Sequence, residues 1–207
     1  MSVYNRRGIQ MKRIHMALVF AAVCVLAFAS VASARPSSGS PGTVELNAGY
    51  AKSSNEVTGT ESLGGGLTFG AGYWRNASPQ VSWGLEAGFD NLGNVEYDNG
   101  DTPDNEITSK AFRINPAIRF KFGAPVGPSF FAQGGAGMYN VSMEIKDSVL
   151  GTADDSQSKI GFNVGAGASF PVGPKSRMSL TGLYHSVSTE GESLNYLQFR
   201  AGIGFGL

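Results

Sequence analysis

The chain has 207 residues, and its sixteen basic and sixteen acidic side chains balance at neutral pH. Once Arg6, Arg7, Lys12 and Arg13 near the N-terminus are set aside, twelve basic and sixteen acidic residues remain, which argues against nucleic acid as a partner. The one cysteine, Cys24, excludes an intrachain disulfide, so stability must come from packing and hydrogen bonding.

The N-terminal segment has the order of a secretory signal. Lys12 and Arg13 precede an apolar run, Ala17–Ala29, and small residues follow at Val31-Ala-Ser-Ala34. A basic start, an apolar middle and a small-residue end are the three parts of a signal peptide. We therefore predict a signal peptide over residues 1–34, cleaved after its last residue.

Other features refine the N-terminal prediction. Met11 is an alternative start, and residues 35–42 are predicted to be a short periplasmic segment before a domain that covers residues 43–207. A membrane-anchor helix is the alternative interpretation, but the apolar run is short for a membrane span. Cys24 lies inside this run and not at the cleavage point, which argues against a lipoprotein.

Eight downstream segments have the period-two pattern of strands with two unlike faces. In the last segment, Leu197, Phe199 and Ala201 are apolar, whereas Gln198 and Arg200 between them are polar. Eight such strands behind a secretory signal favour an all-β fold, an eight-stranded antiparallel up-and-down transmembrane β-barrel. The predicted strands are Thr43–Ala51, Leu63–Trp74, Val81–Phe89, Ile107–Phe122, Ser129–Ile145, Ser158–Phe170, Arg177–His185 and Leu194–Leu207.

The connections between these strands alternate in length. Residues 75–80, 123–128 and 171–176 are short and rich in turn residues, whereas residues 52–62, 90–106, 146–157 and 186–193 are longer and acidic. Outer-membrane barrels have short periplasmic turns and long external loops, so we predict that both termini lie in the periplasm.

The segment Asp90–Glu106 contains six acidic residues and no Lys or Arg. Like charges repel and the segment offers little apolar surface, so we predict a mobile, exposed loop that external protease cuts first. Its oxygen-rich side chains could alternatively hold Ca²⁺, although they lack the spacing of a known calcium loop.

Aromatic residues gather beside the short turns. At these positions they are typical of the girdles that anchor a barrel at the membrane interfaces. The alternative is that aromatic residues are simply enriched in strands. The predicted girdle consists of Tyr73, Trp74, Trp83, Phe122, Phe130, Phe170 and Phe205.

Two strands contain irregularities. Pro116 removes one ladder hydrogen bond, which predicts a bulge at this position. The fifth predicted strand has two apolar phases, one beginning at Phe130 and the other at Tyr139, so either its phase changes or its outer half stands above the membrane. A closed barrel also requires that Val44–Ala51 pair with Phe199–Phe205.

The inward face of the predicted barrel carries charges of both signs. An eight-stranded barrel is just wide enough for side chains, and buried charges must pair or be hydrated. We expect partners on neighbouring strands, Glu86 with Arg113 or Arg119 and Glu45 with Arg200. The set forms a plug of ion pairs or, alternatively, a gated path for small ions. Its members are Glu45, Glu86, Arg113, Arg119, Lys121, His185 and Arg200.

The stretch Tyr184-His-Ser-Val-Ser188 resembles the His-x-Ser pair on the outer surface of lipid A deacylases. A strand needs His and Ser two positions apart to place them on one face, but Val187 occupies that position here. Parity also turns His185 inward. We therefore predict no catalytic residue, no metal, no cofactor and no enzymatic activity.

The segments Pro128–Tyr139 and Tyr196–Phe205 resemble the outer-membrane β-barrel domain family, which includes opacity-type porins and relatives of the OmpA and OmpX barrels. The resemblance implies a monomer in the bacterial outer membrane, in contact with lipid and lipopolysaccharide. Members usually end in an aromatic residue that resembles the signal read by the barrel-assembly machinery. This chain ends in Leu207, with Phe205 two positions earlier on the same face.

The function that these features predict is structural or interactive, with side chains filling the lumen and acidic loops facing the exterior. One alternative is a narrow channel or a carrier for small solutes or hydrophobic molecules. The other alternative is an enzyme that modifies lipid A. No nucleic-acid partner is expected.

Overall fold

The fold is that of a computed structural model. The residues that the structure describes are 42–54, 56–57, 61–62, 64–97, 105–123, 127–147, 151–188 and 193–207. The predicted signal peptide and all but the last residue of the predicted periplasmic segment lie outside these ranges. Within them, no helix is long and apolar enough to cross a membrane.

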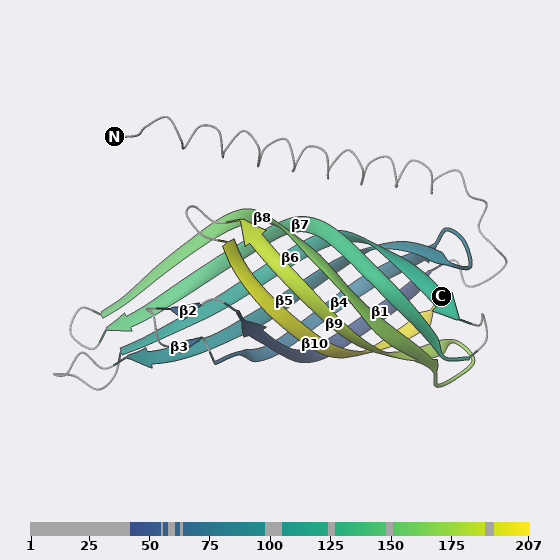
Figure 1. Ribbon diagram of the computed structural model, residues 1–207, viewed down its shortest axis with the longest axis horizontal. Helices are drawn as coiled ribbons and strands as arrows, with labels where there is room; N and C mark the ends of the chain where they lie inside the picture. The colour runs from purple at the N-terminus through teal and green to yellow at the C-terminus, as the bar shows by residue number, and fades with distance from the viewer. Residues whose placement is uncertain are drawn as a thin grey trace, which may run out of the picture. The chain divides into compact units, whose positions relative to one another are not determined.

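Eight strands form one closed barrel (Figure 1). They are β1 (Thr43–Ser53), β4 (Gly66–Asn76), β5 (Val81–Tyr97), β6 (Asn105–Gly123), β7 (Ser129–Asp147), β8 (Gly151–Pro171), β9 (Ser176–Ser188) and β10 (Ser193–Gly206). Two short strands, β2 (Glu56–Val57) and β3 (Glu61–Ser62), pair only with each other. All barrel strands pair antiparallel with their neighbours, which confirms the predicted up-and-down topology.

The pairing between β1 and β10 closes the barrel. Val44 lies opposite Phe205 and Tyr50 lies opposite Phe199, so the predicted pairing is confirmed. On its other side, β1 pairs with β4. Closure matters because an unpaired backbone group in a bilayer has no water to bond.

The two faces of the wall have opposite character. Along β10, Leu197, Phe199 and Phe205 are exposed on the outside, whereas Gln198 and Arg200 are buried inside. The other barrel strands follow the same alternation, with mostly apolar side chains outward and mostly polar or small residues inward. This is the reverse of a soluble barrel, and it suits an apolar solvent outside the wall.

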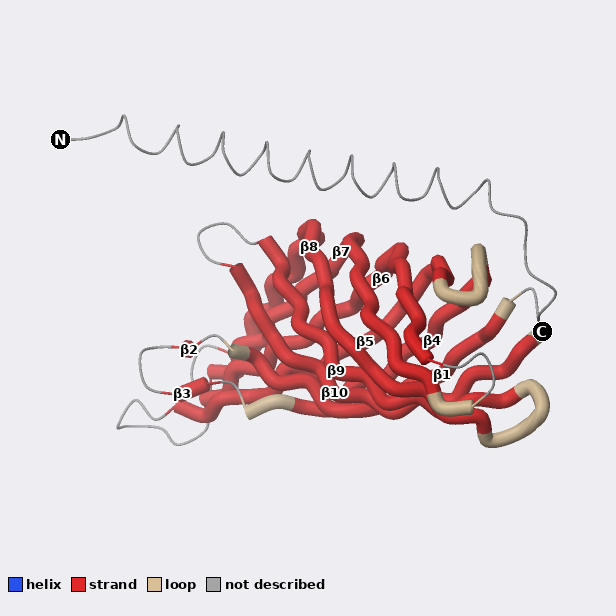
Figure 2. Tube along the Cα trace, turned by 45° about the vertical axis from the view of Figure 1, so that its right-hand side comes forward, coloured by secondary structure: helices blue, strands red, loops and turns tan. Residues whose placement is uncertain are grey.

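The barrel has two distinguishable ends. Gly206 N donates to Lys175 O at 2.7 Å, and Leu207 N donates to Gly42 O at 3.0 Å, so both described chain ends lie beside the β8–β9 connection. Figure 2 shows tan loops that connect strands at the end of the barrel that carries the C-terminus. We call this the turn end and the opposite end the loop end.

Some strands extend further toward the loop end than predicted. β5 continues past its predicted end at Phe89 as far as Tyr97, and β8 begins at Gly151 instead of Ser158. The β8 extension pairs continuously with β7, and the β5 extension pairs with β6 on both sides of one register shift. The predicted loops on this side are therefore partly strand.

This extension changes the prediction for the acidic segment Asp90–Glu106. Asp90 lies within β5 and is fully buried, so its assignment to a mobile exposed loop is wrong. The physical reason is strand parity, because Asp90 points inward with Glu86 and Gly88. Residues 98–104 lie outside the described residues.

The predicted bulge lies in a different strand. Pro116 is paired opposite Leu85, and the register of β6 with β7 is the same on both sides of it, so a bulge at Pro116 is wrong. The register shift instead falls between Asn91 and Gly93 of β5, where Gly93 has φ +101°. Glycine tolerates this conformation without the steric cost of a Cβ.

The ambiguous strand, β7, keeps one phase. Phe130 and Met138 point outward, whereas Tyr139 is buried in the lumen, and the pairing with β8 shows no register shift. β7 has 19 residues, well beyond the roughly 9–11 that cross a bilayer. Of the two predicted explanations, a strand that extends beyond the membrane fits this length and register.

Candidate functional site: the lumen of the barrel

Arg119 organises the turn-end half of the lumen. Its Nη1 donates to Glu45 Oε2 at 2.9 Å, and its Nη2 donates to Gln133 Oε1 at 3.0 Å. The guanidinium also lies between two rings, 4.0 Å from the centroid of Trp74 and 4.2 Å from that of Phe131. Both rings attract the cation through their π faces. Arg119 is thus held by side chains from four other positions of the wall.

Gln133 continues this network to the centre of the lumen. Its Nε2 donates to Glu86 Oε2 at 2.7 Å, and Glu86 Oε1 accepts from Arg200 Nη2. Glu86 belongs to β5 and Arg200 to β10, which are not neighbours in the barrel. The ion pair therefore crosses the lumen.

Asp90 is the centre of the loop-end half. Its carboxylate accepts from Arg113 Nε at 2.8 Å, from Tyr196 OH at 2.8 Å, from Gln198 Nε2 at 2.7 Å and from the Thr68 hydroxyl. These donors come from β4, β6 and β10. Four donors satisfy a buried carboxylate fully, which offsets the cost of removing it from water.

A glycine makes room for the cation of this cluster. Gly88 is paired opposite Arg113, and a Cβ at Gly88 would lie 2.7 Å from Arg113 Nη2 and 2.9 Å from its Cζ. A side chain there would displace the guanidinium. The sequence Glu86-Ala-Gly88 thus leaves space for the arginine of the next strand.

His185 is part of the same buried cluster. It stacks on Tyr196 with ring centroids 4.4 Å apart, and its Nδ1 lies 3.0 Å from Tyr139 OH. Its Nε2 lies 3.3 Å from Gln198 Oε1. His185 therefore faces inward, as parity predicts, and Val187 is buried beside it. This placement separates His185 from the outer surface, where a lipid-modifying pair would need to act.

An apolar layer adjoins the Asp90 cluster on its loop-end side and shares Tyr139 and Tyr196 with it. Leu92 follows Asp90 along β5, and Ala111 precedes Arg113 where β6 enters from the loops. Its six fully buried residues are Ala51, Leu92, Ala111, Tyr139, Val187 and Tyr196, with Val141 and Leu194 packed against them. The layer offers few partners for water at this level of the lumen.

The turn-end mouth of the lumen has a different composition. Lys121 Nζ donates to Asn76 Oδ1 at 2.7 Å. Arg177 Nε donates to Ser169 Oγ at 2.9 Å, and its Nη2 donates to Ser129 Oγ at 3.2 Å. Both cations are half-buried, and the mouth is open to solvent where the deeper lumen is not.

The predicted lumen residues lie inside the barrel, but their predicted pairs are wrong. Glu45 pairs with Arg119 instead of Arg200, and Glu86 pairs with Arg200 instead of Arg113 or Arg119. The prediction assumed partners on neighbouring strands. In a barrel this narrow, long side chains instead meet across the axis.

The prediction that Trp74 belongs to the aromatic girdle is wrong. The Trp74 side chain is only 3% exposed and contacts Arg119, so it belongs to the lumen and not to the predicted girdle. Parity explains this placement, because Tyr73 before it points outward. The remaining predicted girdle residues, Tyr73, Trp83, Phe122, Phe130, Phe170 and Phe205, lie on the outward face.

Several lumen residues were not included in the predicted charge network. Gln133 and Gln198 connect the ion pairs, and Asp90, Tyr139 and Tyr196 complete the loop-end cluster. Strand parity was the available signal. Asp90 lies an even number of positions from Glu86, and Gln198 and Tyr196 lie an even number of positions from Arg200, so each shares the inward face of a predicted lumen residue. No three His, Cys, Asp or Glu side chains come together as a metal site in the described chain.

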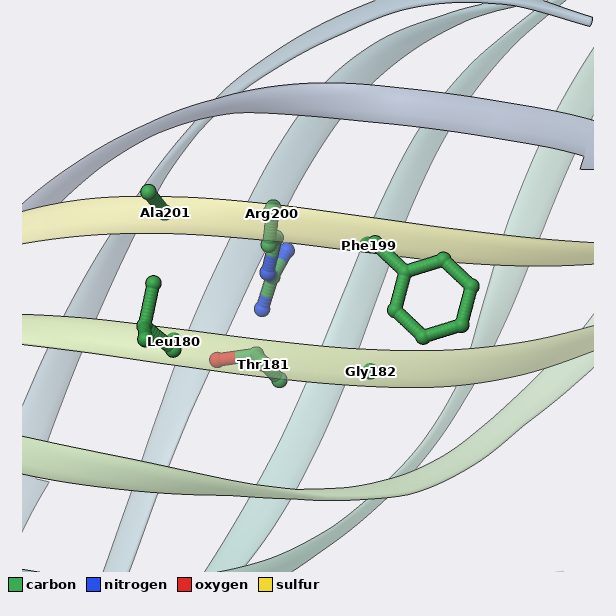
Figure 3. Close-up of a pocket in the computed structure, with 6 residues that line it drawn as sticks. All are labelled: Leu180, Thr181, Gly182, Phe199, Arg200 and Ala201. Atoms are coloured by element: carbon green, nitrogen blue, oxygen red, sulfur yellow. The ribbon is translucent and has the colours of Figure 1, made fainter.

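A shallow hollow of about 410 Å³ lies on the outer wall between β9 and β10 (Figure 3). Gly182 has no side chain, and the Phe199 ring lies beside it, 3.3 Å from where a Cβ would stand. Leu180 and Ala201 complete the apolar lining. The hollow is therefore a feature of the lipid-facing surface and not an entrance to the lumen.

An apolar outer wall around a polar, filled lumen defines an outer-membrane β-barrel. Residues 20–206 match the family model of the outer membrane protein beta-barrel domain. The chain belongs to this family, as predicted, and the family implies the bacterial outer membrane. The comparison with curated proteins gives no match.

Solved structures share the fold at low sequence identity. Neisserial surface protein A is 16% identical, with 83% of this chain and 100% of that chain covered and a TM-score of 0.59. A major outer membrane protein of Thermus thermophilus is 12% identical, with 79% and 98% covered and a TM-score of 0.55. Ail, the attachment invasion locus protein of Yersinia pestis, crystallised with the heparin analogue sucrose octasulfate, is 19% identical, with 79% and 99% covered and a TM-score of 0.51.

Proposed function

We propose that this protein is a non-conducting barrel that holds surface loops at the cell exterior, where they interact with a partner. The observation that carries this proposal is the filled lumen. Side chains from opposite walls bond from Glu45 through Gln133 to Arg200, and the Asp90 cluster and the apolar layer close the loop-end half. Such a barrel serves as a rigid anchor for its loops.

The chemistry of the loop end suggests the kind of partner. Asp155 is exposed, and the segment 96–106 has five acidic residues and no Lys or Arg. A cationic partner, or one bridged by divalent cations, suits this surface. The sulfated ligand of Ail does not, because like charges repel.

Export and assembly complete the proposal. The signal peptide over residues 1–34 exports the chain, and the short turns face the periplasm. The C-terminal strand, with Phe205 near its end, is read by the barrel-assembly machinery. The mature protein is a monomer in contact with outer-membrane lipid and lipopolysaccharide.

Conductance of the refolded protein in planar bilayers tests this function. We expect no discrete openings for the wild type at any voltage that the bilayer withstands. Steady small-ion conductance that scales with the amount of protein would contradict the proposal. A second test compares cells that express the wild type with cells that express a variant in which a Gly-Ser linker replaces residues 98–104. The variant barrel should still fold, but these cells should no longer bind cationic surfaces.

A narrow channel is the second candidate, and one observation favours it. Arg113 Nη1, Arg200 Nε and Nη1, and Asn115 Oδ1 are buried near the centre without a protein partner. Polar groups of this kind can pass small ions or water. The apolar layer opposes a continuous path, and the same conductance measurement separates the two functions.

We further propose that the protein has no enzymatic activity on lipid A, because His185 faces the lumen. Mass spectrometry of lipid A from expressing cells should show no lost acyl chain. An acyl chain that is lost with the wild type and retained with His185→Ala would contradict this.

A further inference from the structure

The three deeply buried arginines of the described lumen are each paired with one carboxylate, whereas the cations of the turn-end mouth are not. Lys121 and Arg177 form no ion pair with any described carboxylate, and their acceptors there are an amide, serine hydroxyls and backbone carbonyls. The deep ion pairs are Arg113–Asp90, Arg119–Glu45 and Arg200–Glu86. The mouth therefore carries two positive charges that no carboxylate of the described residues neutralises.

The two cations converge although their strands are not adjacent. Arg177 belongs to β9, and its guanidinium crosses β8 to reach Ser129 on β7, the neighbour of the strand that carries Lys121. Ser129 is paired opposite Gly123, two positions after Lys121 on β6, so the Arg177 guanidinium lies on the side of the mouth where Lys121 lies, and the nearby carboxylate is that of Glu45. Glu45 is already bonded to Arg119 and to a serine hydroxyl. The negative charge of Glu45 is thus already paired with Arg119, deeper in the lumen than Lys121.

Holding two like charges together at a half-buried site is unfavourable unless an anion joins them. A pit with low-dielectric walls also focuses the field of these charges on its opening. We propose that the turn-end mouth of the lumen binds a phosphate-type anion between Lys121 Nζ and the Arg177 guanidinium. The hydroxyls of Ser129 and Ser169 lie beside the guanidinium as further donors.

Phosphate suits this set of groups better than a carboxylate. Arg177 Nη1 takes no part in the bonds to Gly127, Ser129 and Ser169, so it can donate to a phosphate oxygen, and the Lys121 ammonium adds a second charge-assisted contact. A dianion also matches the two uncompensated charges. The site does not depend on whether the barrel conducts, because it lies at the open end of the lumen.

Titration calorimetry with inorganic phosphate tests the site. The full chain is refolded in a phosphate-free nonionic detergent at constant ionic strength. We expect saturable binding of one phosphate, weakened about tenfold or more by Lys121→Gln and by Arg177→Gln, because each removes a charged hydrogen bond. Lys121→Arg should retain binding. The absence of saturable binding to the wild type would overturn the proposal.

The matched control is Lys110→Gln, which also removes one cation. Lys110 lies near the loop end and pairs with Glu144 at 3.2 Å, so phosphate binding should not change. Arg177→Gln also removes several bonds of the mouth, so a heat-modified gel shift must show that each variant is folded. Equal affinity for wild type and folded Lys121→Gln would overturn the proposal even if Arg177→Gln lost binding.

A second measurement identifies the source of the phosphate group. Protein released from phosphatidylglycerol nanodiscs is weighed by native mass spectrometry. If the wild type retains one more bound lipid than Lys121→Gln does, the site binds a lipid headgroup. Equal lipid counts, together with phosphate binding by the wild type alone, assign it to a soluble anion.

Discussion

The two halves of the lumen solve the problem of buried charge differently. At the loop end, Asp90 and Arg113 are fully buried, the carboxylate accepts four hydrogen bonds, and the apolar layer covers the cluster. At the turn end, Arg119 shares one carboxylate, one amide and two aromatic rings, and the mouth above it holds extra positive charge. The loop-end half is closed by a layer of buried apolar residues, whereas the turn-end half opens to a mouth with half-buried cations.

This difference predicts that the loop-end half contributes more to stability and that the turn-end half is the one able to bind a ligand. A fully buried ion pair loses much when one partner is removed, because the other charge stays buried. A charge near water can recover part of its hydration. Mutations of the same chemical type should therefore cost more at the loop end than at the turn end.

The largest effect is expected for Asp90→Ala. It leaves Arg113 buried without its carboxylate, and the free energy of unfolding should fall by about 3–5 kcal/mol. Urea unfolding in lipid vesicles measures this change. The control is Asp155→Ala on the exposed part of β8, which should leave stability unchanged. A loss below about 1 kcal/mol for Asp90→Ala would mean that this half is hydrated after all.

Truncation of the apolar layer should come next. Leu92→Ala leaves a cavity between the Asp90 cluster and the loops, and we expect a loss of about 2–4 kcal/mol in the same unfolding assay. Leu197→Ala, on the outer wall, should cost less because lipid tails fill the space that it leaves. Equal losses for the two variants would show that Leu92 does not lie in a sealed layer.

A smaller effect is expected at the turn end. Glu45→Gln removes the carboxylate of Arg119, but Gln133 and both rings remain, so the loss should be about 2 kcal/mol. Ser179→Ala, which removes a neutral donor to Glu45, should cost about 1 kcal/mol. If Glu45→Gln destabilises the barrel as much as Asp90→Ala, the contrast between the two halves is wrong.

The smallest effect concerns the two tryptophans. Trp74→Phe weakens the cation–π contact with Arg119 and should cost about 1 kcal/mol. Fluorescence quenching by brominated lipid then reports only Trp83 on the outer wall, and it should be strong. In Trp83→Phe, the emission of Trp74 should resist the same quencher. Strong quenching in both variants would show that Trp74 contacts lipid and belongs to the aromatic girdle.

Much of the fold follows from local pattern. The period of two fixes which face each residue occupies, so parity correctly placed Glu86, Arg113 and His185 inside the wall. The same rule would have placed Asp90 and Trp74 inside. Asp90 was missed because an acidic run suggested a loop, and Trp74 because an aromatic residue beside a turn suggested a girdle.

The sequence by itself determined the number of strands, their order, their antiparallel closure and the apolar character of the outer wall. These features depend on alternation and turn residues, which are local. Only the tertiary structure decided that Glu45 meets Arg119, that Glu86 meets Arg200 and that Lys121 and Arg177 share one mouth. Parity states that a side chain enters the lumen, but the tilt and stagger of the closed wall set which opposite side chain it meets there.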